Sequence, residues 1–144
     1  MKRIMTIIAA ITVFSVAALA DDRPVSPEQL PSAAIAFLNQ YFPDTKITYA
    51  TKDDDLIRPD FNVGLSDGTR VHFSNGGKLE EIENPTSGVP GAIIPVQIAE
   101  YVKNHYPDVL VKEYEVGRRT YDVKLSNRLE LKFNSNFNII EIDD

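Results

Sequence analysis

Two stretches of the chain repeat one pattern of apolar and polar residues. Leu30–Pro43 reads LPSAAIAFLNQYFP, and Ile94–Pro107 reads IPVQIAEYVKNHYP. Residues at offsets of zero, four, seven, eight and eleven form one stripe along an α-helix. A proline near each start and another at each end suit the first turn of a helix and its termination. The stripe positions are Leu30, Ala34, Phe37, Leu38 and Tyr41, and then Ile94, Ile98, Tyr101, Val102 and His105.

After the first helix the pattern changes to the alternation of β-strands. Lys46–Thr51 alternates, with Ile47 and Tyr49 as its apolar positions, and Asp53-Asp54-Asp55 is expected to end that strand. Two further strands alternate over 61–65 and 69–73, and 78–83 is a fourth. Asp67-Gly68 is the favoured pair for a two-residue type I′ hairpin turn.

The second half of the sequence repeats this hairpin at an offset of sixty residues. Tyr121, Val123 and Leu125 match Phe61, Val63 and Leu65, while Leu129, Leu131 and Phe133 match Thr69, Val71 and Phe73. Glycines of the first copy are replaced in the second, where Asn127-Arg128 and Asn136-Phe137 occupy the turns. The sequence therefore predicts an α+β fold of two tandem α-β-β-β-β repeats, residues 28–83 and 92–143, joined by a linker over 84–91. The antiparallel sheet carries its helices on one face and leaves the other open.

The first twenty residues are predicted to be a signal peptide. Lys2 and Arg3 precede an apolar run over 4–16, and Ala18-Leu19-Ala20 forms a small-x-small cleavage site. A membrane anchor is the less favoured alternative, because the run is shorter than the ~20 residues that span a bilayer. We expect a domain over 21–144 that is periplasmic or secreted. Because the sequence contains no cysteine, it also excludes a lipid-anchored cysteine, disulfides and thiolate metal sites.

The charge of the chain excludes some partners. There are 21 acidic and 15 basic residues, and removing Lys2 and Arg3 takes the net charge from −6 to −8. An acidic surface repels phosphate backbones and anionic lipids. We therefore expect no nucleic-acid binding and no stable membrane insertion after cleavage of the signal peptide.

The motif F-x-V-x-L-x-D-G-x-x-V-x-F-x-x-x-G spans Phe61–Gly77 and follows the L-P…Y-F-P helix. In this it resembles the PepSY-like family of small exported proteins, which are frequent in Bacteroidetes. The resemblance extends over residues 28–143. It implies a fold similar to the secreted β-lactamase inhibitor protein, and inhibitor-like or protein-binding behaviour. It supplies no catalytic residues.

Candidate chemistry in the sequence is sparse. No G-x-S-x-G nucleophile elbow is present, so we expect neither an enzyme nor a cofactor. His105 lies on the second helix stripe and is expected at the edge of the core. His72 is expected on the open face, without the neighbouring ligands in sequence that a zinc site requires.

The open sheet face is the predicted binding surface, and its expected partner is an envelope protein. Polar side chains of both signs alternate with the apolar positions and can pair with a partner's polar groups. A face that is merely solvated is the equal alternative. The candidate binding residues are Asn62, Arg70, His72, Asp122, Lys124, Glu130 and Lys132.

An alternative function uses the acidic loop between the first two strands. Asp53, Asp54, Asp55 and Asp60 could supply oxygens to calcium in a small-ligand or calcium-binding periplasmic protein. The loop lacks the D-x-D-x-D-G spacing and the closing glutamate of a calcium loop, which favours a solvated acidic loop.

Overall fold

The structure is a computed structural model that describes residues 22–54 and 57–144. The predicted signal peptide and Asp55 lie outside the described residues. The described part contains two α-helices, α2 (Ser32–Tyr41) and α3 (Val96–His105), and two short 3₁₀ helices, η1 (Pro27–Gln29) and η2 (Gly91–Ile93). Its strands are β1 (Asp22–Pro24), β2 (Ile47–Asp53), β3 (Phe61–Leu65), β4 (Arg70–Phe73), β5 (Leu79–Glu83), β6 (Val111–Val116), β7 (Thr120–Leu125), β8 (Glu130–Asn134) and β9 (Ile139–Asp143).

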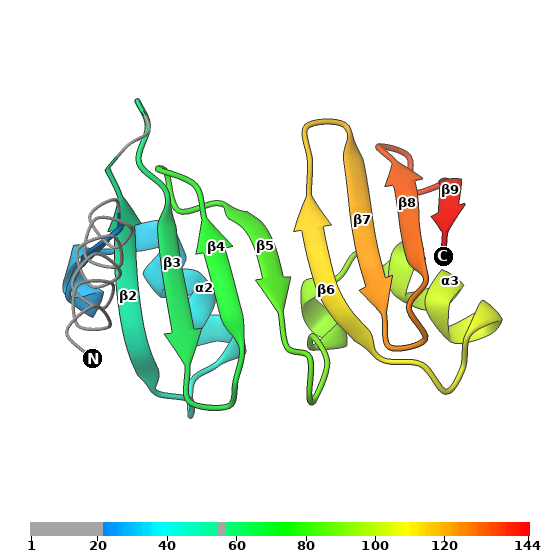
Figure 1. The fold of residues 1–144 in the computed structure, drawn as a ribbon, viewed down its shortest axis with the longest axis horizontal. Coiled ribbons are helices and arrows are strands. Elements are labelled where there is room, and N and C mark those ends of the chain that lie inside the picture. The colour runs from blue at the N-terminus through cyan, green and yellow to red at the C-terminus, as the bar shows by residue number, and fades with distance from the viewer. Residues whose placement is uncertain (1–21, 55–56) are drawn as a thin grey trace, which may run out of the picture.

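The nine described strands form one antiparallel sheet in which each strand pairs with the next along the chain. Figure 1 shows α2 lying behind the strands of the first half (β1–β5) and α3 behind those of the second half (β6–β9). The halves are joined by the pairing of β5 with β6, where Ile82 lies opposite Tyr114. The predicted α+β class, with helices on one face of an antiparallel sheet, is confirmed.

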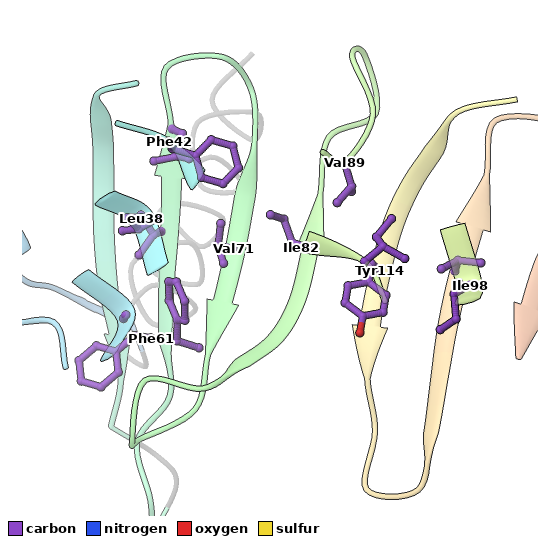
Figure 2. Packing of buried hydrophobic residues seen from close by; sticks show 14 of the residues in the cluster. Leu38, Phe42, Phe61, Val71, Ile82, Val89, Ile98 and Tyr114 are labelled. Carbon is purple, nitrogen blue, oxygen red and sulfur yellow. The ribbon is translucent and has the colours of Figure 1, made fainter. Parts of the chain in front are cut away.

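The helices are held to the sheet by aromatic contacts. Phe37 of α2 packs edge to face on Phe73 of β4, with their ring centroids 5.5 Å apart. Tyr101 of α3 packs in the same way on Phe133 of β8, with a centroid distance of 5.4 Å. Phe73 and Phe133 are each 0% exposed. Figure 2 shows the buried cluster running from Leu38 and Val71 in the first half, through Ile82 and Tyr114, to Ile98 in the second. One core therefore serves both halves of the sheet.

The helix termini differ slightly from the prediction. Pro31 and Pro95 are the N-cap residues, with extended backbone angles, and each helix begins at the following residue. His105 was predicted at the core edge but is exposed, and its ring lies against Tyr101 of its own helix instead of the sheet. Its ring stacks on Tyr101 at 4.0 Å, and its Nδ1 lies 2.9 Å from the Tyr101 carbonyl oxygen.

The turn after β3 is not the type I′ turn that Asp67-Gly68 predicts. Type I′ needs positive φ at both central residues, and of this pair only Gly68 has it, at 90°. Gly68 N–H donates to the Leu65 carbonyl at 3.1 Å, while Leu65 N–H donates to the Thr69 carbonyl at 2.8 Å. This is a three-residue loop, a type I turn closed by a left-handed residue.

The same hydrogen-bond pattern closes three other hairpins. The left-handed position is held by Gly77 after β4, by Arg128 after β7 and by Phe137 after β8, with φ of 84°, 77° and 64°. The second half therefore keeps these turns although it lacks the glycines.

Strand β2 contains a bulge that the alternation of Ile47 and Tyr49 did not predict. The register with β3 shifts between these two residues, so Ile47 packs against the core and Ala50 is buried. Tyr49 instead lies over Gly64 on the other face of the sheet. A Cβ atom added to Gly64 would lie 2.0 Å from the nearest atom of the Tyr49 ring, so a larger residue at Gly64 would displace this tyrosine. The sequence also predicted that the aspartates 53–55 end this strand, whereas β2 continues through Asp53.

Candidate functional site

The candidate site is the sheet face opposite the helices, which we call the open face. Because alternate residues of a strand point to opposite faces, the buried Val71, Ile82 and Leu131 place their strand neighbours on the open face. The open face carries Tyr49, Asn62, Arg70, His72, Glu81, Glu83, Glu113, Glu115, Asp122, Lys124, Glu130, Lys132 and Glu141.

A shallow hollow of about 350 Å³ lies on the first half of the open face. It gathers three of the predicted binding residues, Asn62, Arg70 and His72. Tyr49, which is 47% exposed, forms part of its wall. The bulge in β2 thus brings an aromatic ring to a face that the sequence predicted to be almost purely polar.

A second hollow of about 320 Å³ lies on the second half and contains Lys124 and Glu130 from the prediction. Glu83 lines both hollows, so they meet where β5 pairs with β6. The two remaining predicted residues, Asp122 and Lys132, lie opposite each other on β7 and β8. The open face therefore holds two polar depressions that share Glu83, and we call the line along which β5 pairs with β6 the ridge.

Four glutamates face one another across that ridge, and we call them the glutamate cluster. Glu81 lies opposite Glu115, and Glu83 lies opposite Glu113. Like charges directly opposite one another destabilise a pair of strands. Carboxylate oxygens of Glu81, Glu83 and Glu113 come within 4.8 Å of one another, close enough to share a cation.

Crowding in the glutamate cluster changes the titration of one member. The pKa of Glu81 rises from 4.5 to about 7, first because burial disfavours its charged form. A hydrogen bond with Glu113 and the charges of Glu113, Glu115 and Glu83 raise the pKa of Glu81 further. Near neutral pH the cluster thus holds a proton that an additional positive charge could displace.

The predicted cations of the open face already have carboxylate partners. Arg70 pairs with Glu83 at 2.7 Å, and Lys132 lies 3.7 Å from Glu141. Lys124 lies 3.3 Å from Glu113, whose charge is the main cause of a raised Lys124 pKa. These pairs neutralise the basic side chains, so the charge that remains on the face is negative.

His72 is surrounded by oxygen atoms. Its Nε2 lies 3.0 Å from Asp60 Oδ2 and 3.2 Å from Glu80 Oε2, and its Nδ1 lies 2.8 Å from Asn62 Oδ1. We call Asp60, His72 and Glu80 the His72 cluster. The sequence identified no metal partners for this histidine because Asp60 and Glu80 belong to other segments of the chain.

Two described aspartates of the predicted calcium loop, Asp54 and Asp60, have different partners in the structure. Asp54 pairs with Arg23 and lies 4.0 Å from Lys52, whereas Asp60 turns to His72. Asp53 is the last residue of β2 and donates its N–H to the Asp60 carbonyl at 2.9 Å. Among the described residues, the groups that could hold a metal are the His72 cluster and three members of the glutamate cluster.

Sequence reasoning missed the glutamates and Tyr49. The sequence does contain a signal that these glutamates share the polar face. Each pair flanks a buried residue, with Glu81 and Glu83 on either side of Ile82, and Glu113 and Glu115 on either side of Tyr114. Their meeting depends on the pairing of β5 with β6, which joins segments about thirty residues apart. The alternation of residues within one strand does not predict which strand it pairs with.

These features define a class: α+β proteins whose antiparallel sheet carries helices on one face and exposes a polar, hollowed surface on the other. The profile of one such family, described as "Putative beta-lactamase-inhibitor-like, PepSY-like", matches residues 59–141. The chain belongs to this PepSY-like family, which confirms the resemblance seen in Phe61–Gly77.

Solved structures of Bacteroides proteins are similar over most of the chain. A "putative calcium-regulated periplasmic protein" from Bacteroides thetaiotaomicron is 40% identical, with a TM-score of 0.83 over 86% of this chain and 98% of that one. A "putative periplasmic protein" from Bacteroides vulgatus is 36% identical, with a TM-score of 0.81 over 87% and 98%. Another protein from Bacteroides vulgatus, described as periplasmic and of unknown function, is 29% identical, with a TM-score of 0.80 over 85% and 99%.

No curated protein matched the chain. Neither the family description nor the descriptions of the three Bacteroides proteins assigns an enzymatic activity. Within residues 22–54 and 57–144, no helix has the length and apolar character needed to cross a membrane.

Proposed function

We propose that this protein is exported to the periplasm and binds an envelope protein through its open face, without catalysing a reaction. The basic n-region and cleavage site at residues 1–20 support export, as do the periplasmic descriptions of the similar proteins. The matching order of α2 with β2–β5 and α3 with β6–β9 supports two tandem copies of one unit. An inhibitor-like role would use the same face.

The observation that carries this proposal is the glutamate cluster. Folding brings like charges together on the open face, where Glu81 opposite Glu115 and Glu83 opposite Glu113 destabilise the strand pairing. Such a cost is typical of residues retained for binding. Because Arg70 and Lys124 are already paired with glutamates, the ligand that fits the ridge is a cationic segment of the partner.

Tyr49 supplies the aromatic anchor that a protein interface usually requires. Its exposed ring lines the first hollow, which Glu81 and Glu83 of the ridge also line. Interface energy concentrates in aromatic and arginine side chains at the centre of a contact. We therefore place the partner's segment across the ridge, with an apolar contact on Tyr49.

The test is capture of envelope proteins with matched charge variants in the presence of chelator. Glu81→Gln with Glu115→Gln removes two carboxylates from the ridge. Asp44→Asn with Asp108→Asn removes two from the exposed turns after α2 and α3. Proteins captured by the wild type should be lost with the first variant and retained with the second, and Tyr49→Ala should reduce their yield. Equal capture by the ridge variant would contradict the proposal.

A second candidate function is calcium binding, supported by the description of the 40% identical Bacteroides thetaiotaomicron protein as calcium-regulated. The oxygens of Glu81, Glu83 and Glu113 are the hard ligands that calcium prefers. Calcium bound there would cancel the negative charge of the ridge and release a cationic partner.

Calorimetric titration separates this site from the acidic loop. Calcium should bind the wild type and the Asp53→Asn, Asp54→Asn variant, and should not bind the Glu83→Gln, Glu113→Gln variant. Binding lost only with the aspartates would assign calcium to the loop. Magnesium at equal concentration is the control ion, because it dehydrates reluctantly and demands a tighter octahedral site.

A further inference from the structure

We propose that the His72 cluster is a binding site for zinc or a similar divalent transition metal. Its three ligands come from separate segments of the chain. Asp60 immediately precedes β3, His72 lies within β4, and Glu80 occupies β5. The inference does not depend on the proposed function, because it needs no protein partner and uses none of the glutamate cluster, although Asn62 and His72 line the first hollow of the open face.

The ligand atoms are close to the spacing that zinc requires. The three atoms all lie within 4.8 Å of one another, and Nε2 is 3.0 and 3.2 Å from the two carboxylate oxygens. Zinc bonds to nitrogen and oxygen of about 2.0–2.2 Å in a tetrahedron place two ligand atoms ~3.3–3.5 Å apart. Measured from Nε2, the carboxylate oxygens of Asp60 and Glu80 need to withdraw only a few tenths of an ångström to admit the ion.

Asn62 orients the histidine for this task. With the proton on Nδ1, the ring donates to Asn62 Oδ1 at 2.8 Å, and the Nε2 lone pair faces Asp60 and Glu80. Metal-binding histidines are held in this way, by a hydrogen bond from the nitrogen that does not bind the metal. Asn62 lies directly opposite His72 on β3, so the support is built into the sheet.

A β-bulge directs the third ligand. The register between β4 and β5 shifts between His72 and Phe73, which leaves Glu80 as the extra residue and brings its carboxylate to Nε2. The equivalent bulge between β8 and β9 carries Ile140, and Lys132 stands where His72 does. The second half thus has the same geometry without the ligands, so the metal-binding residues are not a requirement of the fold.

The donor set selects the class of metal. One imidazole with two carboxylates suits zinc and neighbouring transition metals, whereas calcium prefers oxygen ligands alone. The side chains of His72, Asp60 and Glu80 are 32%, 20% and 43% exposed, so water or a ligand atom can complete the coordination. The two carboxylates also balance the charge of a divalent ion.

The test is calorimetric titration of the untagged, chelator-treated protein with zinc chloride. We expect one zinc per chain. His72→Gln and Glu80→Gln should each weaken binding by at least about tenfold, and Asn62→Ala by roughly 10–100-fold, as is usual for a supporting residue. The matched control is His105→Gln, which removes the other histidine of the sequence and should bind zinc as the wild type does.

Nitrogen NMR of the imidazoles provides an independent measurement, in which zinc should shift Nε2 of His72 and leave His105 unchanged. Unaltered zinc binding in both His72→Gln and Glu80→Gln would overturn the proposal. Loss of zinc binding in Glu83→Gln with Glu113→Gln, but not in His72→Gln, would also overturn it, by assigning the ion to the glutamate cluster.

Discussion

Arg128 and Phe137 hold backbone conformations that glycine usually supplies. Their φ values of 77° and 64° match those of Gly68 and Gly77 in the corresponding turns of the first half. A residue with a Cβ is strained in this region by roughly 1–2 kcal/mol. The turns persist because the hydrogen bonds of the flanking strands impose them.

The strain at Arg128 can be relieved by substitution. Arg128→Gly should raise the free energy of unfolding by about 0.5–1 kcal/mol, since relief of the strain exceeds the entropy that glycine loses on folding. Urea denaturation measures the change. Gly68→Ala is the reciprocal variant and should lower stability. A lower free energy of unfolding for Arg128→Gly would show that the contacts of the arginine side chain stabilise the fold by more than the strain of its backbone costs.

Asn84 fixes the segment that the sequence presented as a simple linker. It is 2% exposed, and its Nδ2 donates to Thr69 Oγ1 at 3.1 Å. Its Oδ1 accepts from the backbone N–H groups of Thr86 and Ser87 at 3.1 and 2.9 Å. One buried amide therefore ties the connection between the halves to the β3–β4 hairpin.

Replacing Asn84 should leave several polar groups without partners. Asn84→Ala is expected to cost about 1–3 kcal/mol of unfolding free energy, the usual penalty for an unsatisfied buried group. Chemical denaturation of Asn75→Ala, an exposed turn position, provides the control and should differ by less than ~0.5 kcal/mol. Equal stability of the two variants would contradict this prediction, because it would mean that water replaces the hydrogen bonds of Asn84.

At the scale of elements, each helix depends on one buried phenylalanine beneath it. Phe73→Ala or Phe133→Ala should cost about 3–5 kcal/mol, because each removes a fully buried ring and its contact with the helix. Val96→Ala on the exposed side of α3 is the control for denaturation measurements. A loss below 1 kcal/mol at both phenylalanines would contradict the packing described above.

The pairing of β5 with β6 should make stability depend on pH. Glu81 titrates near 4.5 when unfolded and near 7 when folded, so between these values the folded state binds the extra proton. The free energy of unfolding should therefore fall as pH rises from 4.5 through 7. Urea titrations at pH 4.5 and 8 should show a smaller fall for Glu81→Gln than for Glu28→Gln, whose carboxylate is exposed. Equal falls would contradict this role for Glu81.

For the whole molecule, the sequence predicts what depends on local periodicity. The stripe positions place α2 and α3 within two residues of their observed starts, and alternation identifies the buried face of both hairpins. Strand β1 was not predicted, because its three residues have no periodicity and pair with β2 only through tertiary contact.

The candidate site was predicted in part for the same reason. Arg70, His72 and Lys124 follow from alternation within one strand, but their carboxylate partners come from other strands. The bulges that redirect Tyr49 and Glu80 add one residue to a strand without a local signature. Only the assembled sheet shows these contacts.

The short junction between the halves also determines where the native molecule can open. Three residue pairs join β5 to β6, whereas five join β7 to β8. Amide protons that point across the junction should exchange with deuterium faster than those between β7 and β8, because opening there breaks fewer bonds and separates like charges. Native-state hydrogen exchange followed by NMR measures this, and Glu81→Gln should slow it. Equal protection at the two places would instead mean that Ile82 and Tyr114 lock the halves into one cooperative unit. Faster exchange at the junction would mean that the two halves flex about the ridge. Such flexing would adjust the curvature of the open face to the shape of its ligand.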